Sequence, residues 1–391
     1  MTAHQRKVLL DDERGRGFPV VIQYGPYIFV GGSDGHRNLA TETIDPELAN
    51  KAVEQCRNSY GRVQQRLTKA GFSGSCAVWI QNFTSGQHWR LERMAQWPEF
   101  FGEVEHGYAV SFGAQTHTSG INMLTSCVLA VTPDIERHVA VKQPTRGRAS
   151  RITRVGPLVF VIGVRGHADP ATGEHAPEET ADSFDVQLDY CFKAIGSHLK
   201  KDGTPPENIV RVDTALRGAR FVPRYQQGVR RYFGGKAPFA GYAVGTILGA
   251  RCEHEIGAVA VSPGEKKDVW WSAADPTTAD ATRGGGLTFL RNCSGMRDEA
   301  KGTTLRELHG RGPEQVKQAV ANVQALLRKT GRALDSLLRL DVFVRDIYAE
   351  EEIVAALKAT LGTAMPVINV IGTEPAHGAE LELTAIAGGA A

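Results

Sequence analysis

Three stretches decide the fold: GPYIFVGG at residues 25–32, GPLVFVIG at 156–163 and GGLTFLRN at 285–292. Each opens on a glycine-containing turn and continues as a β-branched and aromatic run, a pattern that predicts a turn followed by a strand. The stretches begin 131 and 129 residues apart. A spacing this regular indicates that the 391-residue chain repeats one structural unit three times.

A predicted helix follows each of these strands and ends at a glycine. The three glycines are Gly71, Gly203 and Gly331, which are 132 and 128 residues apart. In the third unit, apolar residues between Val316 and Leu327 recur at helical spacing on one face. The helices are therefore a second landmark with the same period.

Further strands recur in the same order. The second strand is AVWIQNF at 77–83, IVRVDTAL at 209–216 and LLRLDVFV at 337–344, and the closing strands end at Val131, Val261 and Gly388. Polar, turn-rich segments that join the units start at Thr132 and Ser262. We predict an α/β (α+β) protein of three tandem domains, at 1–140, 141–270 and 271–391. Because one such unit alone would expose an apolar sheet face, we expect the three to pack together as an intramolecular pseudo-trimer.

The composition is that of an ordinary globular protein, with 42% hydrophobic and 23% charged residues. The formal net charge of +2 gives no broad field that would attract nucleic acid or an anionic membrane. The polar start of the sequence has no apolar signal region, and no apolar run approaches the roughly 20 residues that span a bilayer. We therefore expect a cytoplasmic protein without nucleic-acid or membrane partners.

The strand LLRLDVFVRD at 337–346, the preceding helix end L-x-x-x-G and the closing strand ELELTAIAG at 380–388 resemble the Rid/YjgF (reactive intermediate deaminase) pattern. The resemblance covers nearly the whole chain, once per unit, and is clearest in the third. It implies a RidA-like, chorismate-mutase-like fold in which a small sheet is backed by two helices. Family members are typically homotrimers with a ligand cleft at each subunit interface, so the resemblance implies a small-molecule substrate in a cleft between units, and no cofactor.

The resemblance also implies which positions form the site. Family deaminases hydrolyse imines and enamines derived from amino acids, and an arginine on a closing strand binds the substrate carboxylate. That position falls on His106, Ala240 and Val367, so no unit keeps the arginine. Either the substrate differs from a 2-imino acid, or another cation binds the substrate carboxylate. The candidates for such a cation are Arg165, Arg217, Arg220 and Arg291.

A family glutamate near the final strand helps to place the water. Its position falls on Glu255 and Glu382 in the second and third units, and on Thr125 in the first. A carboxylate in an apolar strand is costly unless it is paired or used. His106 lies between Glu105 and Gly107 near Tyr108, in a polar set suited to acid–base work at neutral pH. We predict Glu382, Glu255 and His106 as catalytic residues.

The predicted substrate-binding residues border the same clefts: Tyr108, Tyr242, Asn369, Arg165, His167 and Arg291. His167 belongs to a Gly-His pair that the first unit shares at Gly35-His36, which common turn geometry would also explain. We predict no metal site, because adjacent strand residues in Cys252-Glu253-His254-Glu255 point to opposite faces.

These observations favour an enzyme that acts on a small metabolite by acid–base hydrolysis, such as imine or enamine deamination, or by a related elimination or rearrangement. One alternative is a chorismatase-like lyase, which uses a Rid-like fold on a cyclic enol-ether acid. The other is a non-catalytic protein that binds a small metabolite. The divergence of the units suggests that their clefts are not equivalent, and the chain is expected to work either as a self-contained monomer or in a higher homo-oligomer.

Overall fold

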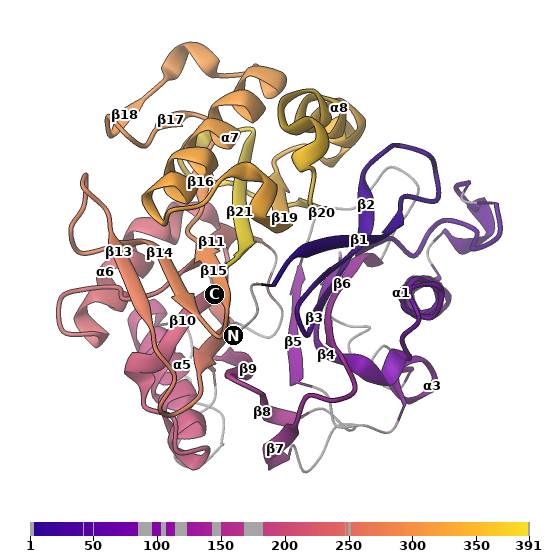
Figure 1. The fold of residues 1–391 in the computed structure, drawn as a ribbon. Coiled ribbons are helices and arrows are strands. Elements are labelled where there is room, and N and C mark those ends of the chain that lie inside the picture. Colours follow the sequence, from indigo (N-terminus) through magenta and orange to yellow (C-terminus); the bar gives the residue numbers. More distant parts are fainter. Residues whose placement is uncertain are drawn as a thin grey trace.

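The computed structural model describes residues 4–41, 43–49, 51–84, 96–102, 107–113, 123–142, 150–167, 183–246, 248 and 252–389. Within these ranges the helices form three pairs on separate sides of a body of strands, α1 with α3, α5 with α6, and α7 with α8 (Figure 1). No helix in these ranges is long and apolar enough to cross a membrane.

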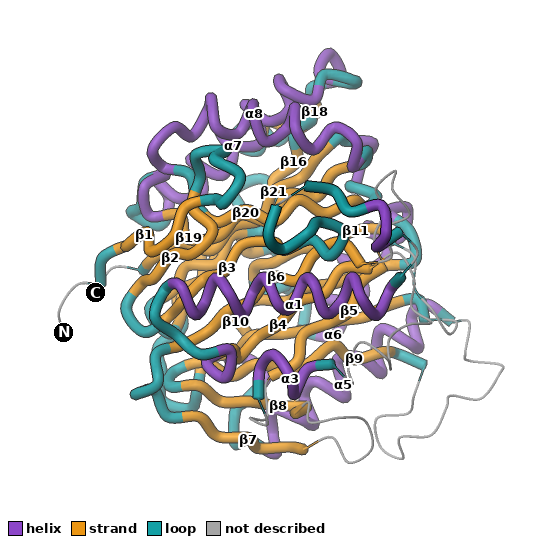
Figure 2. Tube along the Cα trace, turned by 90° about the vertical axis from the view of Figure 1, so that its right-hand side faces the viewer, coloured by secondary structure: helices purple, strands orange, loops and turns teal. Residues whose placement is uncertain are grey.

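The first unit is a sheet with the order β1-β2-β3-β6-β4-β5. Its neighbouring strands are antiparallel except for β4 and β5, which run parallel. Helix α1 lies across the outer face of this sheet (Figure 2). The elements are β1 (Arg6–Asp11), β2 (Pro19–Tyr24), β3 (Tyr27–Ser33), α1 (Ala52–Lys69), β4 (Ala77–Thr84), α3 (Trp97–Phe101), β5 (Gly107–Gly113) and β6 (Met123–Val131).

The second unit repeats this order as β7-β8-β9-β12-β10-β11, again with one parallel pair, β10 and β11. Its elements are β7 (Arg137–Lys142), β8 (Ser150–Val155), β9 (Leu158–Arg165), α5 (Phe184–Lys201), β10 (Ile209–Leu216), α6 (Val222–Tyr232), β11 (Ala240–Gly245) and β12 (His254–Val261). Strands β5 and β8 pair at Gly107 and Ser150, so the first two units share one 12-stranded sheet.

The third unit has the order β13-β14-β15-β21-β19-β20 in a sheet of its own, with β16 beside β21. Its elements are β13 (Asp268–Trp271), β14 (Ala279–Gly284), β15 (Leu287–Leu290), β16 (Cys293–Ser294), β17 (Arg297–Asp298), β18 (Thr303–Thr304), α7 (Gly312–Lys329), β19 (Leu337–Val344), α8 (Glu350–Leu361), β20 (Val367–Gly372) and β21 (Leu381–Gly388). The predicted domain limits after residues 140 and 270 fall inside β7 and β13, each of which pairs with the next strand of the chain. These limits remain predictions.

The inner faces of the three units share one apolar core. Phe29, Phe160 and Phe289 occupy the same position in β3, β9 and β15, are at most 2% exposed and belong to one buried cluster. Burying a side chain of this size contributes roughly 1.5–3 kcal/mol. The opposite face of each sheet packs against its own helices. The inner sheet faces of the three units thus cover one another.

A buried ring of polar side chains lies where β4, β10 and β19 approach one another. Arg211 donates to Asp213 at 2.8 Å and to Asp341 at 3.2 Å. Arg339 donates to Asp341 at 2.8 Å and also to the side-chain oxygen of Gln81. The Gln81 amide closes the ring by donating to Asp213 at 3.1 Å. Buried charges are tolerated here because each is paired and hydrogen-bonded.

The first unit contributes a tryptophan where the others contribute arginine. Trp79 pairs with β5 and β6 in the register that Arg211 and Arg339 have with their own neighbours. Both guanidinium groups lie near the Trp79 ring, at 5.8 and 5.2 Å from its centroid, which is cation–π geometry. The three units therefore meet around one common centre although their residues there have diverged.

Candidate functional site

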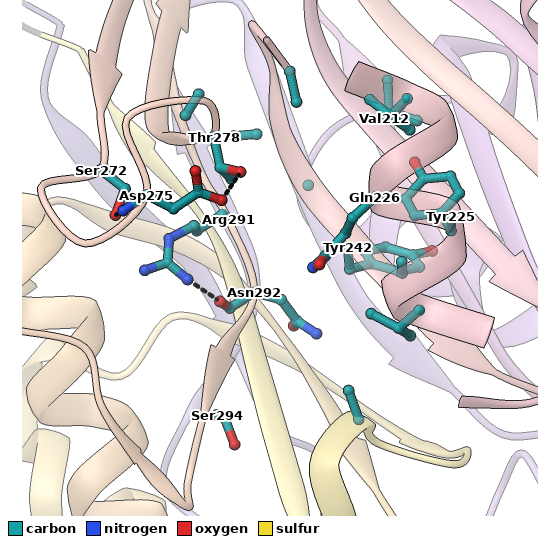
Figure 3. Close-up of a pocket in the computed structure, with 18 of the residues that line it drawn as sticks. Val212, Tyr225, Gln226, Tyr242, Ser272, Asp275, Thr278, Arg291, Asn292 and Ser294 are labelled. Carbon is teal, nitrogen blue, oxygen red and sulfur yellow. Dashed lines mark hydrogen bonds between the residues drawn. The ribbon is translucent and has the colours of Figure 1, made fainter. Parts of the chain in front are cut away.

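A cavity of about 300 Å³ lies between the second and third units. This volume is at the lower end of the range typical of small-molecule sites, roughly 300–1,000 Å³. Figure 3 shows two groups of residues facing each other across it. Val212, Tyr225, Gln226 and Tyr242 come from the second unit, and Ser272, Asp275, Thr278, Arg291, Asn292 and Ser294 come from the third.

Strand alternation places Glu382 on the wall of this cavity. In β21, Leu381 and Leu383 pack into the core beneath the helices. Glu382 between them must therefore point to the opposite, inner face. It is opposite Phe343 of β19 and Ser294 of β16, and only 3% of it is exposed. The local pattern of the strand thus forces a carboxyl group into a buried position beside the cavity.

The partners of Glu382 are neutral. The Asn292 amide donates to its carboxylate at 2.6 Å, and the backbone N–H of Ala376 donates to it as well. No ion pair between described residues includes Glu382. Burial, reinforced by the nearby charge of Glu299, raises the pKa of Glu382 to about 8 against the two hydrogen bonds, which lower it. The group is therefore mostly a neutral carboxylic acid at pH 7.

Asn292 is suited to both charge states of this acid. Its Nδ2 donates to Glu382, while its Oδ1 is buried without a hydrogen-bond partner in the described part of the chain. Half a turn of the amide would let Oδ1 accept the proton of neutral Glu382. The same side chain can thus hold Glu382 before and after it has given up a proton.

Glu255 occupies the matching position in the second unit but has a different partner. It lies opposite Ala215 of β10, as Glu382 lies opposite Phe343 of β19. Arg165 binds it at 3.2 Å, whereas the residue opposite Glu382 in the register is Ser294. Glu255 therefore forms an ion pair with an arginine, whereas Glu382 forms no ion pair with any described residue.

Two arginines and a shared glutamate form the polar end of the cavity. Arg291 donates to Asp280 and to Glu299, both at 2.7 Å. Nε of Arg297 lies 3.2 Å from the same Glu299, and the Arg297 side chain is 38% exposed. None of the hydrogen bonds between described residues uses the Arg297 guanidinium. Arg291 is thus committed to its carboxylates, whereas Arg297 can bind an anion in the cavity.

Three of the residues predicted from the sequence line this cavity: Glu382, Tyr242 and Arg291. The hydroxyl of Tyr242 lies 3.5 Å from the Gln81 amide in the central ring. Asn369, the matching residue of the third unit, is fully buried and donates to Asp341 at 2.6 Å. Its amide therefore contributes to the ring and lies away from the cavity lining.

A second group of predicted residues gathers at the matching edge of the second unit. Besides the Arg165–Glu255 pair, Nδ1 of His167 lies 2.9 Å from Sγ of Cys252.

Two predicted residues of the first unit are not described. His106 lies outside the described ranges, and so does the side chain of Tyr108, whose backbone belongs to β5. Gly107 pairs with Trp79, as Ala240 pairs with Arg211 in the second unit.

The cleft between the first and third units is much smaller than the cavity that Glu382 lines. It has a volume of about 30 Å³ near Gly31 and Ile368, enough for little more than water. The clefts that the described residues define are thus not equivalent.

Four residues of the cavity lining were not predicted from the sequence: Asn292, Ser294, Arg297 and Glu299. All four lie in the polar run RNCSGMRDE at 291–299, directly after the first strand of the third unit, of which only Arg291 was singled out. The position of this run beside a cleft was the available signal. The described residues hold no group of three or more His, Cys, Asp or Glu side chains that could bind a metal.

No protein-family model and no curated protein matches this sequence. A crystal structure of a chorismatase matches 80% of this chain and 93% of its own, with a TM-score of 0.53 and 13% identity. A putative endoribonuclease L-PSP from Entamoeba histolytica covers 32% of this chain and 99% of its own, with a TM-score of 0.28 and 20% identity. A YjgF-family protein from Mycobacterium tuberculosis covers the same shares, with a TM-score of 0.26 and 19% identity. The chain therefore has the RidA-like α/β fold of chorismatase, which the sequence predicted.

Proposed function

We propose that the cavity between the second and third units is an active site in which Glu382 is the general acid. The observation that carries this proposal is a buried carboxyl group beside the cavity whose partners are an amide and a backbone N–H, with no cation paired to it among the described residues. Keeping such a group neutral at pH 7 gives the site a proton donor of suitable strength. A structural carboxylate would be expected to have a partner like Arg165.

The reaction that fits a buried acid is hydrolysis of an electron-rich double bond. The proposed substrate is a small carboxylic acid with a C2–C3 double bond and nitrogen or oxygen on C2, an enamine or enol-ether acid. The proton of Glu382 moves to C3, where the double-bond electrons form the new C–H bond, and nitrogen or oxygen stabilises the cation at C2. Water adds to C2 and loses a proton.

The intermediate then breaks down. The C2–N or C2–O bond breaks as its heteroatom takes up a proton, which releases ammonia or an alcohol. The remaining hydroxyl proton at C2 returns to Glu382, and a 2-oxo acid is left. Every proton that leaves a protein group is thus restored within one turnover.

The charges of the cavity support an anionic substrate. Arg297 supplies a guanidinium that no described residue hydrogen-bonds, in place of the family arginine that the sequence lacks. A guanidinium binds a carboxylate with two parallel hydrogen bonds. Val212, Val222 and Phe239 give the cavity an apolar wall for the rest of the molecule.

A chorismatase-like cleavage is the second candidate, and the fold match over 80% of this chain favours it. Chorismate, the substrate that the name implies, is also an enol-ether acid, so the same protonation by Glu382 would begin the reaction. In either case we propose that the chain works as an intramolecular pseudo-trimer with one competent cleft.

One assay tests both candidates, because each of three substrates would release pyruvate. They are 2-aminoacrylate generated in the reaction mixture, 2-methoxyacrylate, and chorismate. We expect the wild type to hydrolyse at least one of them and Glu382→Gln to lower kcat by about 100-fold or more. The exposed Glu207, which is not one of the residues that line the cavity, provides the control Glu207→Gln.

Two results would contradict the proposal. Equal turnover by wild type and Glu382→Gln would remove Glu382 from the reaction. A higher melting temperature of the wild type with these acids, without release of pyruvate, would instead indicate a protein that only binds a metabolite.

A further inference from the structure

The loop between β20 and β21 contains a backbone conformation that its residue disfavours. His377 has φ 57° and ψ 22°, and no other non-glycine residue in the described part of the chain has positive φ. A side chain with a Cβ atom is disfavoured there because Cβ crowds the neighbouring carbonyl oxygen. Such residues persist where the surroundings hold them, and they concentrate at functional sites.

Contacts with the second unit hold the start of this loop. Glu374 and Gly245 exchange two backbone hydrogen bonds, with N···O distances of 2.9 and 2.8 Å. The carboxylate of Glu374 also accepts the backbone N–H of Ala219 at 2.9 Å. The loop is therefore fastened to the unit that forms the opposite wall of the cavity.

The end of the loop brings His377 beside the acid. Ala376 is buried, and its N–H donates to Glu382. The next residue, His377, lines the same cavity and is exposed. Its ring has no hydrogen bond to any described residue, so it remains available to water or a ligand.

We propose that His377 is the second catalytic residue of this cavity, the base that activates the attacking water. The inference rests on the proposed function of Glu382. After Glu382 has protonated C3, the imidazole takes a proton from water as its oxygen bonds to C2. The imidazolium then gives this proton to the departing nitrogen or oxygen, and the C2–heteroatom bond breaks. Both residues finish the turnover in their starting forms.

A purely structural reason would favour glycine at this position. Glycine adopts positive φ without the Cβ clash, whereas histidine, like asparagine and aspartate, is found there but pays that steric cost. The following residue, Gly378, already has φ 75°. The exposed imidazole of His377 lines the cavity and lies one residue from the N–H that binds Glu382, so it is placed to act on a substrate beside the acid.

The test compares His377→Gly with wild type by pyruvate release from 2-methoxyacrylate. We expect kcat to fall about 100-fold or more, while the melting temperature stays the same or rises because glycine relieves the backbone. Added imidazole should restore activity in a concentration-dependent manner, since the vacated space is exposed. His377→Asn should lose activity without this rescue, and the exposed His309→Ala serves as the control.

The possible failures are distinguishable. If Glu382→Gln is inactive but His377→Gly retains its kcat, the role of His377 is wrong and that of Glu382 stands. Loss of activity in His377→Gly with a lower melting temperature and no rescue would show a structural role and overturn the inference. If the wild type does not hydrolyse 2-methoxyacrylate, 2-aminoacrylate or chorismate, the proposed function fails and the inference falls with it.

Discussion

The variant Glu382→Gln should be more stable than the wild type at high pH, because the wild type loses stability as the pH rises. Burial raises the pKa of this carboxyl from 4.5 to about 8. The folded state therefore favours the neutral acid, and its contribution is fully present below pH 4.5 and lost as the pH passes through about 8. At about 1.4 kcal/mol per pKa unit, this shift corresponds to roughly 5 kcal/mol between those limits.

Glutamine has the shape of glutamic acid and stays neutral, so this pH dependence should disappear. We expect wild type and Glu382→Gln to have similar unfolding free energies at pH 5. At pH 9 the variant should be more stable by several kcal/mol, on the order of the full shift. Urea unfolding at pH 5, 7 and 9 measures the difference.

Glu255→Gln is the matched comparison for stability. It removes a charge that Arg165 binds at 3.2 Å and leaves that arginine, 14% exposed, without its carboxylate. We expect a loss of about 1–3 kcal/mol at neutral pH, opposite in sign to the effect at Glu382. Equal destabilisation by Glu382→Gln at pH 5 and pH 9 would refute the reasoning about the cavity.

Three other substitutions test the acid, the substrate-binding cation and the buried polar ring separately. Ser294→Arg would give Glu382 a cation, so the basic limb of its pH–rate profile should move to lower pH and kcat at neutral pH should fall. Arg297→Gln removes the cation proposed to bind the substrate carboxylate, and KM for 2-methoxyacrylate should rise about 10- to 100-fold with little change in kcat, as one charge-assisted hydrogen bond contributes roughly 1.5–3 kcal/mol. Asp341→Asn leaves Arg211 without one of its two carboxylates in the buried ring, and urea unfolding should show a loss of about 3–5 kcal/mol.

The fold could be predicted because its evidence repeats along the sequence. The strands that begin at Tyr27, Leu158 and Leu287 follow turns that recur with a period near 130 residues, and each turn sets up the same element order. Because the pattern occurs three times, the fold can be predicted even where one copy lacks a recognisable element. The replacement of Arg211 and Arg339 by Trp79 at the centre was not anticipated, because it matters only once the three units meet.

The site could be predicted only in part. The apolar context of Glu382 and Glu255 identified both as unusual carboxyl groups. Their difference depends on the residue across the neighbouring strand, which is Ser294 for one and Arg165 for the other. That register cannot be derived from spacing alone, since a shift of one residue reverses every side chain. His377 was missed because its signal is a backbone conformation.

The most direct measurement is a titration of the Glu382 carboxyl group by infrared difference spectroscopy, wild type minus Glu382→Gln. We expect a protonated carboxylic acid band at pH 6 that disappears with a midpoint near 8. A carboxyl group that is already ionised at pH 6, with its midpoint near 4.5, would contradict the claim that this cavity contains a neutral acid.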